Sequence, residues 1–158
     1  MKTARAKFQK GFTLIELLVV IGILAVLLAI TLIAINPARQ FEQANNTQRA
    51  SDVNAILNGV WQFAVDNNGD LTPLAIPATA TNIGSDTVGG DVDLCPDIAP
   101  QYIAQLPVDP QTGAWDVDGD GDGCEDYDTQ YEILQTAAGR VTVTAPDAEG
   151  GAVISVTR

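Results

Sequence analysis

The chain has 158 residues, eight of them basic and twenty acidic, and its formal net charge at pH 7 is −12. It contains no histidine and only two cysteines, which excludes Ser-His-Asp catalytic sets and leaves a poor donor set for zinc. No lysine or arginine occurs between Arg49 and Arg140. Because nucleic-acid binding depends on basic side chains, we do not expect this subunit alone to bind nucleic acid.

The N-terminal segment is basic and then apolar. Four of the eight basic residues lie in the first ten positions, and from Phe12 to Ile35 the only polar side chains are Thr13, Glu16 and Thr31. As a helix this run would reach about 36 Å, enough to cross a hydrocarbon core of about 30 Å. By the positive-inside rule, the basic leader predicts a cytoplasmic N-terminus and a C-terminal part outside.

Glu16 is the unusual residue of this run. A charge at the bilayer centre costs on the order of 3 kcal/mol or more, so a carboxylate in lipid predicts a functional site. If the chain were cut before Phe12, the new amine could pair with Glu16, within one helix or between staggered neighbouring subunits. Such pairing would favour assembly over the single subunit. The alternative is a plain transmembrane anchor in which Glu16 has no role.

The sequence Lys-Gly-Phe-Thr-Leu-Ile-Glu at positions 10–16, after a short basic leader, resembles the class III signal of type IV pilins and type II secretion pseudopilins. In that family a membrane peptidase cuts after the glycine and methylates the new N-terminal residue. The resemblance implies cleavage between Gly11 and Phe12, N-methylation of Phe12 and an assembly role for Glu16. It extends over residues 7–66, and the cut would leave a lysine-free chain of net charge −16.

After the apolar run, Asn36-Pro37 predicts either a bend or the start of a second helix, because proline suits the first helical position. Residues 38–49 are mostly polar and suit a helical spacer. Apolar residues then recur at helical spacing from Val53 to Ala64, with Asp52 among the polar residues of the opposite side. Gly69 can end a helix in the left-handed conformation. We expect a helix from about 38 to 66.

The rest of the chain predicts a small sheet. Residues 70–93 are rich in proline and glycine and read as an irregular connection, and a short helical turn is expected from Pro100 to Pro107. β-Branched side chains predict strands at 130–135, 140–144 and 152–157. The expected fold is α+β and pilin-like, a long N-terminal helix packed on a small antiparallel sheet. The expected segments are a leader at 1–11, a transmembrane and polymerisation helix at 12–35, its continuation at 36–66 and a globular headgroup at 67–158.

An acidic stretch from 116 to 128 resembles the first half of an EF-hand calcium loop. Aspartates occupy alternate positions of the loop, and glycine occupies the sixth. Cys124 is at the ninth position and Tyr127 at the twelfth, where an EF-hand loop has a bidentate glutamate. Calcium sites near this region also occur in major pseudopilins. The hypothesis is a calcium site, and the alternative is a solvated acidic turn. The candidate ligands are Asp116, Asp118, Asp120, Asp122, Asp126 and Asp128.

The cysteines, Cys95 and Cys124, both fall in the part expected outside the cytoplasm. One intramolecular disulfide is therefore predicted, with two free thiols as the alternative. A closed loop of about 30 residues would stabilise the fold by roughly 3 kcal/mol.

These features predict a structural subunit without catalytic activity, a major pilin or major pseudopilin of a type IV pilus-like or type II secretion filament. The implied partners are copies of the chain, a prepilin peptidase, an inner-membrane assembly platform and membrane lipid before assembly. The implied location is the bacterial inner membrane as precursor, with the C-terminal domain outside, and then an extracellular or envelope-spanning filament. The alternatives are a monomeric membrane-anchored calcium-binding surface protein or adhesin, and an envelope enzyme that uses the acidic cluster.

Overall fold

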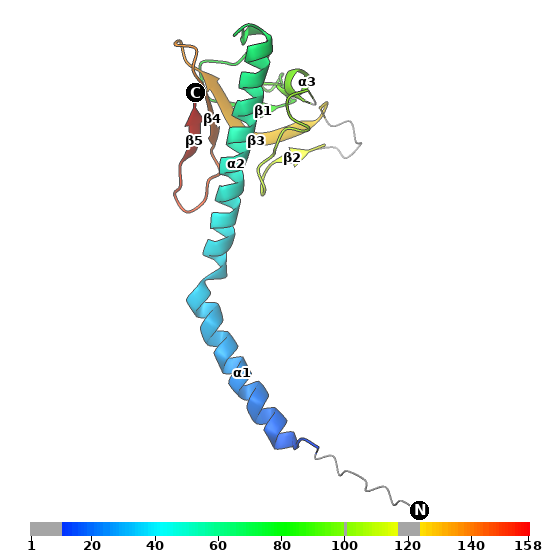
Figure 1. Cartoon of the computed structure of the whole chain (residues 1–158), viewed down its shortest axis with the longest axis vertical. Coiled ribbons are helices and arrows are strands. Elements are labelled where there is room, and N and C mark those ends of the chain that lie inside the picture. Colours follow the sequence, from blue (N-terminus) through cyan, green and yellow to red (C-terminus); the bar gives the residue numbers. More distant parts are fainter. Residues whose placement is uncertain (1–10, 100, 117–123) are drawn as a thin grey trace, which may run out of the picture. The chain divides into compact units, whose positions relative to one another are not determined.

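A computed structural model describes residues 11–99, 101–116 and 124–158 (Figure 1). The chain divides into two compact units, Met1–Ala38 and Arg39–Arg158.

Helix α1 spans Leu14–Ile35 and none of its residues is buried within the chain. By length and composition alone it could cross a membrane. It ends at Asn36, which adopts the left-handed conformation with φ of 45°. Asparagine tolerates that conformation better than most residues because its short polar side chain can form local hydrogen bonds. A second helix, α2, starts directly afterwards, so regular helical geometry is interrupted at one residue.

Helix α2 spans Pro37–Asp66 and buries its apolar stripe in the second unit. Val53, Ile56, Leu57 and Val60 are completely buried. The helix ends where the N–H of Gly69, at φ of 88°, donates to the carbonyl of Ala64 over 2.7 Å. The boundaries agree with the expected helix over 38–66, since both the stripe and its glycine terminator are local features of the sequence.

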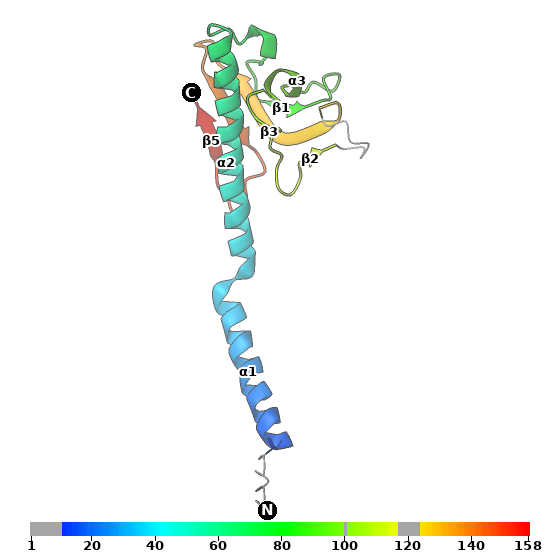
Figure 2. The same ribbon diagram turned by 45° about the vertical axis from the view of Figure 1, so that its right-hand side comes forward.

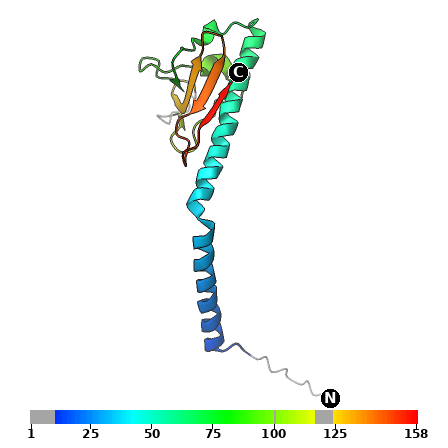
Figure 3. The same ribbon diagram turned by 90° about the vertical axis from the view of Figure 1, so that its left-hand side faces the viewer.

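The second unit contains a five-stranded antiparallel sheet of order β1-β3-β4-β5, with β2 paired to β3. Figures 2 and 3 show α2 running alongside this sheet. The strands are β1 Thr81–Gly84, β2 Ala114–Trp115, β3 Tyr127–Gln135, β4 Val141–Ala145 and β5 Ile154–Thr157.

One face of the sheet forms the core with α2. Alternate residues of β3 and β4 are buried, as expected when one face of a sheet is covered and the other is solvated. The opposite face carries hydroxyl pairs across β4 and β5, with oxygen–oxygen distances of 2.8 Å for Thr142 and Thr157 and 3.1 Å for Thr144 and Ser155. These elements confirm the predicted α+β, pilin-like architecture.

Two local predictions are wrong, and one strand is absent from the predictions. Residues 70–93 contain a 3-10 helix, η1 at Thr72–Leu74, and the strand β1, and β2 was not expected at all. The short helix α3 lies at Cys95–Ile98, whereas residues 101–105 form turns and bends. The sequence does not predict β1 and β2, because each strand is short and forms only by pairing with β3, which is distant in the sequence.

Close packing accounts for one glycine in α2. A Cβ on Gly59 would lie 2.9 Å from a methyl group of Ile98, so the glycine admits α3 against the helix. Figure 2 shows α3 beside β1 on the same side of the unit.

Candidate functional site

Thr13 and Glu16 form a capping box at the start of α1. The backbone N–H of Glu16 donates to the hydroxyl oxygen of Thr13 over 3.2 Å, and the Thr13 N–H donates back to Glu16 Oε2 over 3.2 Å. The Thr13 hydroxyl also donates to Oε2, over 3.0 Å. Two N–H groups that the helix itself leaves unpaired are thereby satisfied.

This geometry gives Glu16 a local role that does not require a partner chain. A carboxylate near a helix N-terminus is favoured by the helix dipole, and a satisfied N–H group is cheaper to place in an apolar environment. The capping hydrogen bonds all use Oε2 of the carboxylate.

The residues before the helix are open. Gly11, Phe12 and Thr13 lie outside regular secondary structure, and Phe12 is 90% exposed. A Cβ on Gly11 would meet nothing within 4 Å. The described part of the chain therefore sets no steric requirement for glycine at this position.

The second unit holds an ion pair that sequence analysis missed. Arg49 of α2 is 1% exposed, and its guanidinium binds the carboxylate of Asp109 at two points, Nε–Oδ2 at 2.5 Å and Nη2–Oδ1 at 3.0 Å. Two N–H groups, of Gln111 and Thr112, also donate to Asp109 Oδ1. Burial raises the pKa of the Asp109 carboxyl, but the hydrogen bonds from Arg49 and the two N–H groups outweigh it, so the pKa lies below its usual value.

Glu149, in the connection between β4 and β5, joins the same network. Its Oε2 lies 3.1 Å from Nη1 of Arg49 and accepts the Asn45 side-chain amide over 3.0 Å. The Asn46 carboxamide accepts the Glu149 N–H over 2.9 Å and donates to the Glu149 carbonyl over 2.9 Å. Three neighbouring residues of α2 thus hold this connection in place.

Asp52 is also buried, which corrects its assignment to a polar side of the helix. It is 5% exposed and accepts the hydroxyl of Tyr131 over 2.9 Å and the side-chain amide of Gln48 over 2.8 Å. Burial raises the pKa of Asp52 despite these two hydrogen bonds. The nearby carboxylate of Asp109 also raises the pKa of Asp52.

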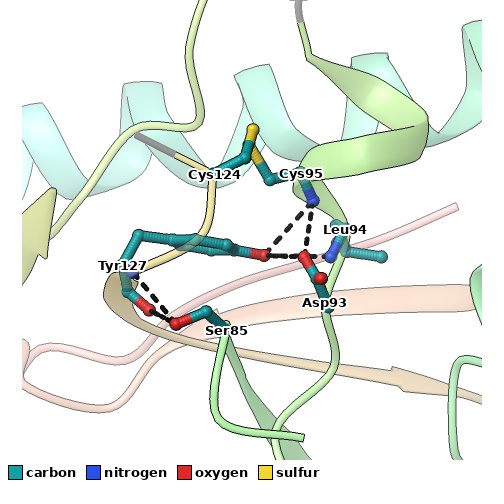
Figure 4. The surroundings of a disulfide bond; sticks show 6 residues. All are labelled: Ser85, Asp93, Leu94, Cys95, Cys124 and Tyr127. Atoms are coloured by element: carbon teal, nitrogen blue, oxygen red, sulfur yellow. Dashed lines mark hydrogen bonds between the residues drawn. A yellow bond between two sulfur atoms is a disulfide. The ribbon is translucent and has the colours of Figure 1, made fainter. Parts of the chain in front are cut away.

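Cys95 and Cys124 are joined by a disulfide whose Cα atoms lie 5.5 Å apart. Figure 4 shows the Tyr127 ring next to it. The buried Tyr127 hydroxyl donates to Asp93 Oδ1 over 2.8 Å and accepts the N–H groups of Leu94 and Cys95 over 3.0 and 3.2 Å. Burial, with the bond to Asp93, raises the pKa of Tyr127. The tyrosine fixes the segment that carries the first cysteine.

The candidate calcium ligands are only partly described. Asp118, Asp120 and Asp122 lie outside the described residues, and Asp116 and Asp126 flank them directly after β2 and directly before β3. Asp128 accepts the side-chain amides of Asn82 over 3.0 Å and of Gln130 over 2.6 Å. Within the described ranges, no group of three or more His, Cys, Asp or Glu residues could hold a metal ion. The calcium site stays a prediction.

Comparison with protein families finds one match. Residues 6–32 fit the family model described as Prokaryotic N-terminal methylation motif. The N-terminal part of the chain therefore carries a prokaryotic N-terminal methylation motif. The searches of curated proteins and of solved structures each gave no match.

The methylation motif covers Gly11 and Phe12 as well as Thr13 and Glu16, which form the capping box. It confirms the resemblance to type IV pilins and pseudopilins, implies processing by a prepilin peptidase, and points to a structural subunit of pilus-type assemblies. With the exposed apolar helix α1, it is consistent with membrane anchoring of the precursor.

Proposed function

We propose that this chain is a structural subunit, a major pilin or major pseudopilin, that polymerises through α1 into a type IV pilus-like or type II secretion filament. The observation that carries the proposal is Glu16, the third residue of α1 and the only charged residue of that helix, within the methylation motif. A carboxylate at that place is unfavourable in lipid unless a cation meets it.

Cleavage after Gly11 would supply that cation. The new amine of Phe12 would be one residue from the capping Thr13, and methylation would leave it basic. The capping hydrogen bonds occupy Oε2 of Glu16, so Oε1 can accept a hydrogen bond from the amine of a neighbouring copy. The cap thus holds the carboxylate in one orientation while the pairing favours the assembled state.

Before assembly, the subunit would be stored in the inner membrane with α1 in lipid and the second unit outside the cytoplasm. The disulfide between Cys95 and Cys124 supports that placement, because disulfides persist in oxidising compartments. The assembly platform and the peptidase would then act on the membrane-embedded precursor.

The acidic loop is proposed to bind calcium in the folded subunit. Seven carboxylates lie between Asp116 and Asp128 without a basic residue, and their mutual repulsion would be relieved by a divalent cation. The disulfide at Cys124 anchors this stretch to α3.

Two measurements on protein from its native host test the proposal. Mass spectrometry of the purified chain should show an N-terminus at Phe12 carrying one added methyl group, and electron microscopy should show filaments that contain the chain. A processed chain that stays monomeric in the membrane would instead favour a membrane-anchored surface protein. Retention of Met1–Gly11 would contradict the proposal as a whole.

A further inference from the structure

A hollow of about 610 Å³ lies near the C-terminal end of α2, between the helix and the segment that follows α3. The two segments approach closely, since a Cβ on Gly59 would lie 3.5 Å from a methyl carbon of Ile103. The volume is within the range of about 300–1,000 Å³ that is typical of small-molecule sites. The lining includes two aromatic side chains, three carboxamides and one carboxylate. These are Trp61 and Tyr102, then Asn58, Gln62 and Gln101, and Asp66.

The two aromatic side chains offer carbon surface to the hollow. The indole Nε1 of Trp61 is buried and has no hydrogen-bond partner in the described part of the chain, so the half-buried indole can present only carbon. Tyr102 is half-buried too, and its ring packs edge-on against Phe63, with the ring centroids 6.0 Å apart. Aromatic carbon in such a place packs well against another apolar surface, such as the C–H face of a sugar ring.

Hydrogen bonds hold the polar groups of the hollow in place. The Tyr102 hydroxyl donates to Oδ2 of Asp66 over 3.0 Å, and it accepts the side-chain amide of Gln101 over 3.3 Å. On α2, Oδ1 of Asn58 accepts Nη1 of Arg158 over 2.5 Å. The Asn58 amide nitrogen and the second oxygen of Asp66 are not used in these bonds and can serve a ligand. A polar set that is fixed before binding loses less freedom when the ligand enters.

These groups together indicate the chemical class of the ligand. The hydroxyls of a neutral sugar both donate and accept hydrogen bonds, as do the carboxamides of Asn58, Gln62 and Gln101. The Asp66 carboxylate accepts from hydroxyl donors, and such charge-assisted hydrogen bonds are the stronger kind. The aromatic carbon serves the apolar face of the sugar ring.

Other classes of ligand fit less well. An anion would face the Asp66 carboxylate in a chain whose net charge is −12. A purely apolar ligand would cover exposed carboxamides and leave them without hydrogen bonds, which is costly. An organic cation could pair with Asp66 and the rings, but it too would leave the carboxamides unpaired.

We propose that this hollow binds a neutral sugar residue, with the apolar face of the sugar on Trp61 and Tyr102 and its hydroxyls on Asp66 and the carboxamides. The hollow lies entirely within the second unit, Arg39–Arg158, and none of its lining residues belongs to the methylation motif. The inference therefore goes beyond the filament function and does not depend on it. An open site binds a ligand of this size weakly, with a Kd on the order of 1 mM.

Saturation-transfer NMR on the full chain tests the proposal. The chain is solubilised in a detergent without a sugar headgroup, and glucose, galactose, mannose and N-acetylglucosamine are each added at millimolar concentration. At least one sugar should receive saturation from the protein, strongest at the C–H protons of one ring face. Choline and inorganic phosphate are the comparison ligands. Transfer to none of these sugars, or to choline or phosphate alone, would overturn the proposal.

Two substitutions locate the site. Asp66→Asn keeps an acceptor for Tyr102 but removes the charge, and it should weaken sugar binding roughly tenfold. Trp61→Leu removes the aromatic surface and should abolish the saturation transfer. Asp70→Asn is the matched control, since Asp70 is an exposed acid outside the hollow, and it should leave the affinity unchanged.

Melting temperatures show whether each variant is folded. If Trp61→Leu does not fold, Asp66→Asn still decides, because the exposed Asp66 lies outside the core. Equal sugar affinities of Asp66→Asn and the native chain would overturn the assignment of the hollow. Sugar binding without filaments on electron micrographs would support the site and count against the filament function, whereas filaments without sugar binding would overturn only the site.

Discussion

Arg49 and Asp109 are 60 residues apart in the sequence and meet in a buried two-point ion pair. The pair joins α2 to the segment before β2, and Glu149 extends it to the connection between β4 and β5. A guanidinium and a carboxylate in this arrangement give directional bonds that apolar packing does not. The register of α2 against the remainder of its unit is therefore fixed by polar contacts as well as by Val53, Ile56 and Val60.

Breaking this pair should strongly destabilise the second unit. Arg49→Met leaves the Asp109 carboxylate buried and unpaired, which should cost about 3–5 kcal/mol of unfolding free energy. The free energy can be measured by urea denaturation of the full chain in detergent. Arg140→Met is the control, since Arg140 is exposed and makes no ion pair in the described part of the chain. Equal effects of the two substitutions would contradict the role given to Arg49.

Lowering the pH should change the stability of the second unit through Asp109 and Asp52, whose pKa values in the folded state are shifted in opposite directions. The pKa of Asp109 is lowered in the folded state, so its stabilisation is complete above the ordinary aspartate pKa of about 3.9 and is lost as the pH falls through the lower, folded value. The pKa of Asp52 is raised, so its contribution declines as the pH rises from the ordinary pKa through the raised one.

Asp52→Asn separates these contributions. The variant removes the ionisation but keeps an acceptor for Tyr131, so its stability relative to the native chain should improve as the pH rises above about 4. Melting temperatures recorded from pH 2 to pH 7 test this. A constant difference between the two chains across that range would mean that Asp52 does not titrate in the way its burial implies.

At Glu16, cap and charge can be tested separately. Glutamine can also serve at the third position of a capping box, so Glu16→Gln keeps the cap and removes the charge, whereas Glu16→Val removes both. If charge pairing drives assembly, both variants should insert in the membrane and both should form far fewer filaments. Thr13→Ala weakens the cap and keeps the charge, and should retain filaments. Normal filament number with Glu16→Gln would show that the carboxylate acts only as a cap.

Gly11→Val should block processing without affecting the fold. The structure leaves space for a Cβ at this position, so any loss of cleavage reports on the peptidase active site. The unprocessed chain should keep Met1–Gly11, as detected by mass spectrometry, and should melt at the same temperature as the native chain. Efficient cleavage of the valine variant would place the scissile bond elsewhere.

Calcium should raise the melting temperature if the acidic loop binds it. Binding to the folded state alone adds about 2.7 kcal/mol at one hundred times Kd, so the full chain should melt several degrees higher in millimolar calcium than in chelator. Asp118→Asn combined with Asp120→Asn should remove most of that difference, while Glu132→Gln, on β3, should retain it. Identical melting curves in calcium and in chelator would mean that the acidic loop is a solvated turn and not a calcium site.

The parts of the molecule that sequence predicted are those determined by neighbouring residues. The run from Phe12 to Ile35, the stripe from Val53 to Ala64 and the alternation in β4 each reflect a local period, so their elements were located to within a few residues. The methylation motif is equally local, and its residues occupy fixed positions at the start of α1.

What sequence missed depends on contacts between distant segments. The sequence places Arg49 in a polar spacer because apolar periodicity carries no information about a buried guanidinium. Its partners Asp109 and Glu149 lie 60 and 100 residues away. One signal was available: Arg49 is the last basic residue before Arg140 in a strongly acidic chain. For β1 no such signal existed, because its pairing with β3 is what makes it a strand.

The interruption at Asn36 has a mechanical consequence for the proposed filament. With α1 held among its neighbours, a pull on the globular units would pass through one backbone residue in the left-handed conformation. Regular helix resists extension through its ladder of hydrogen bonds, whereas a residue between two helices can change its dihedral angles without breaking either ladder. Under tension, Asn36 would lengthen first, and each subunit would act as a short elastic link in the fibre.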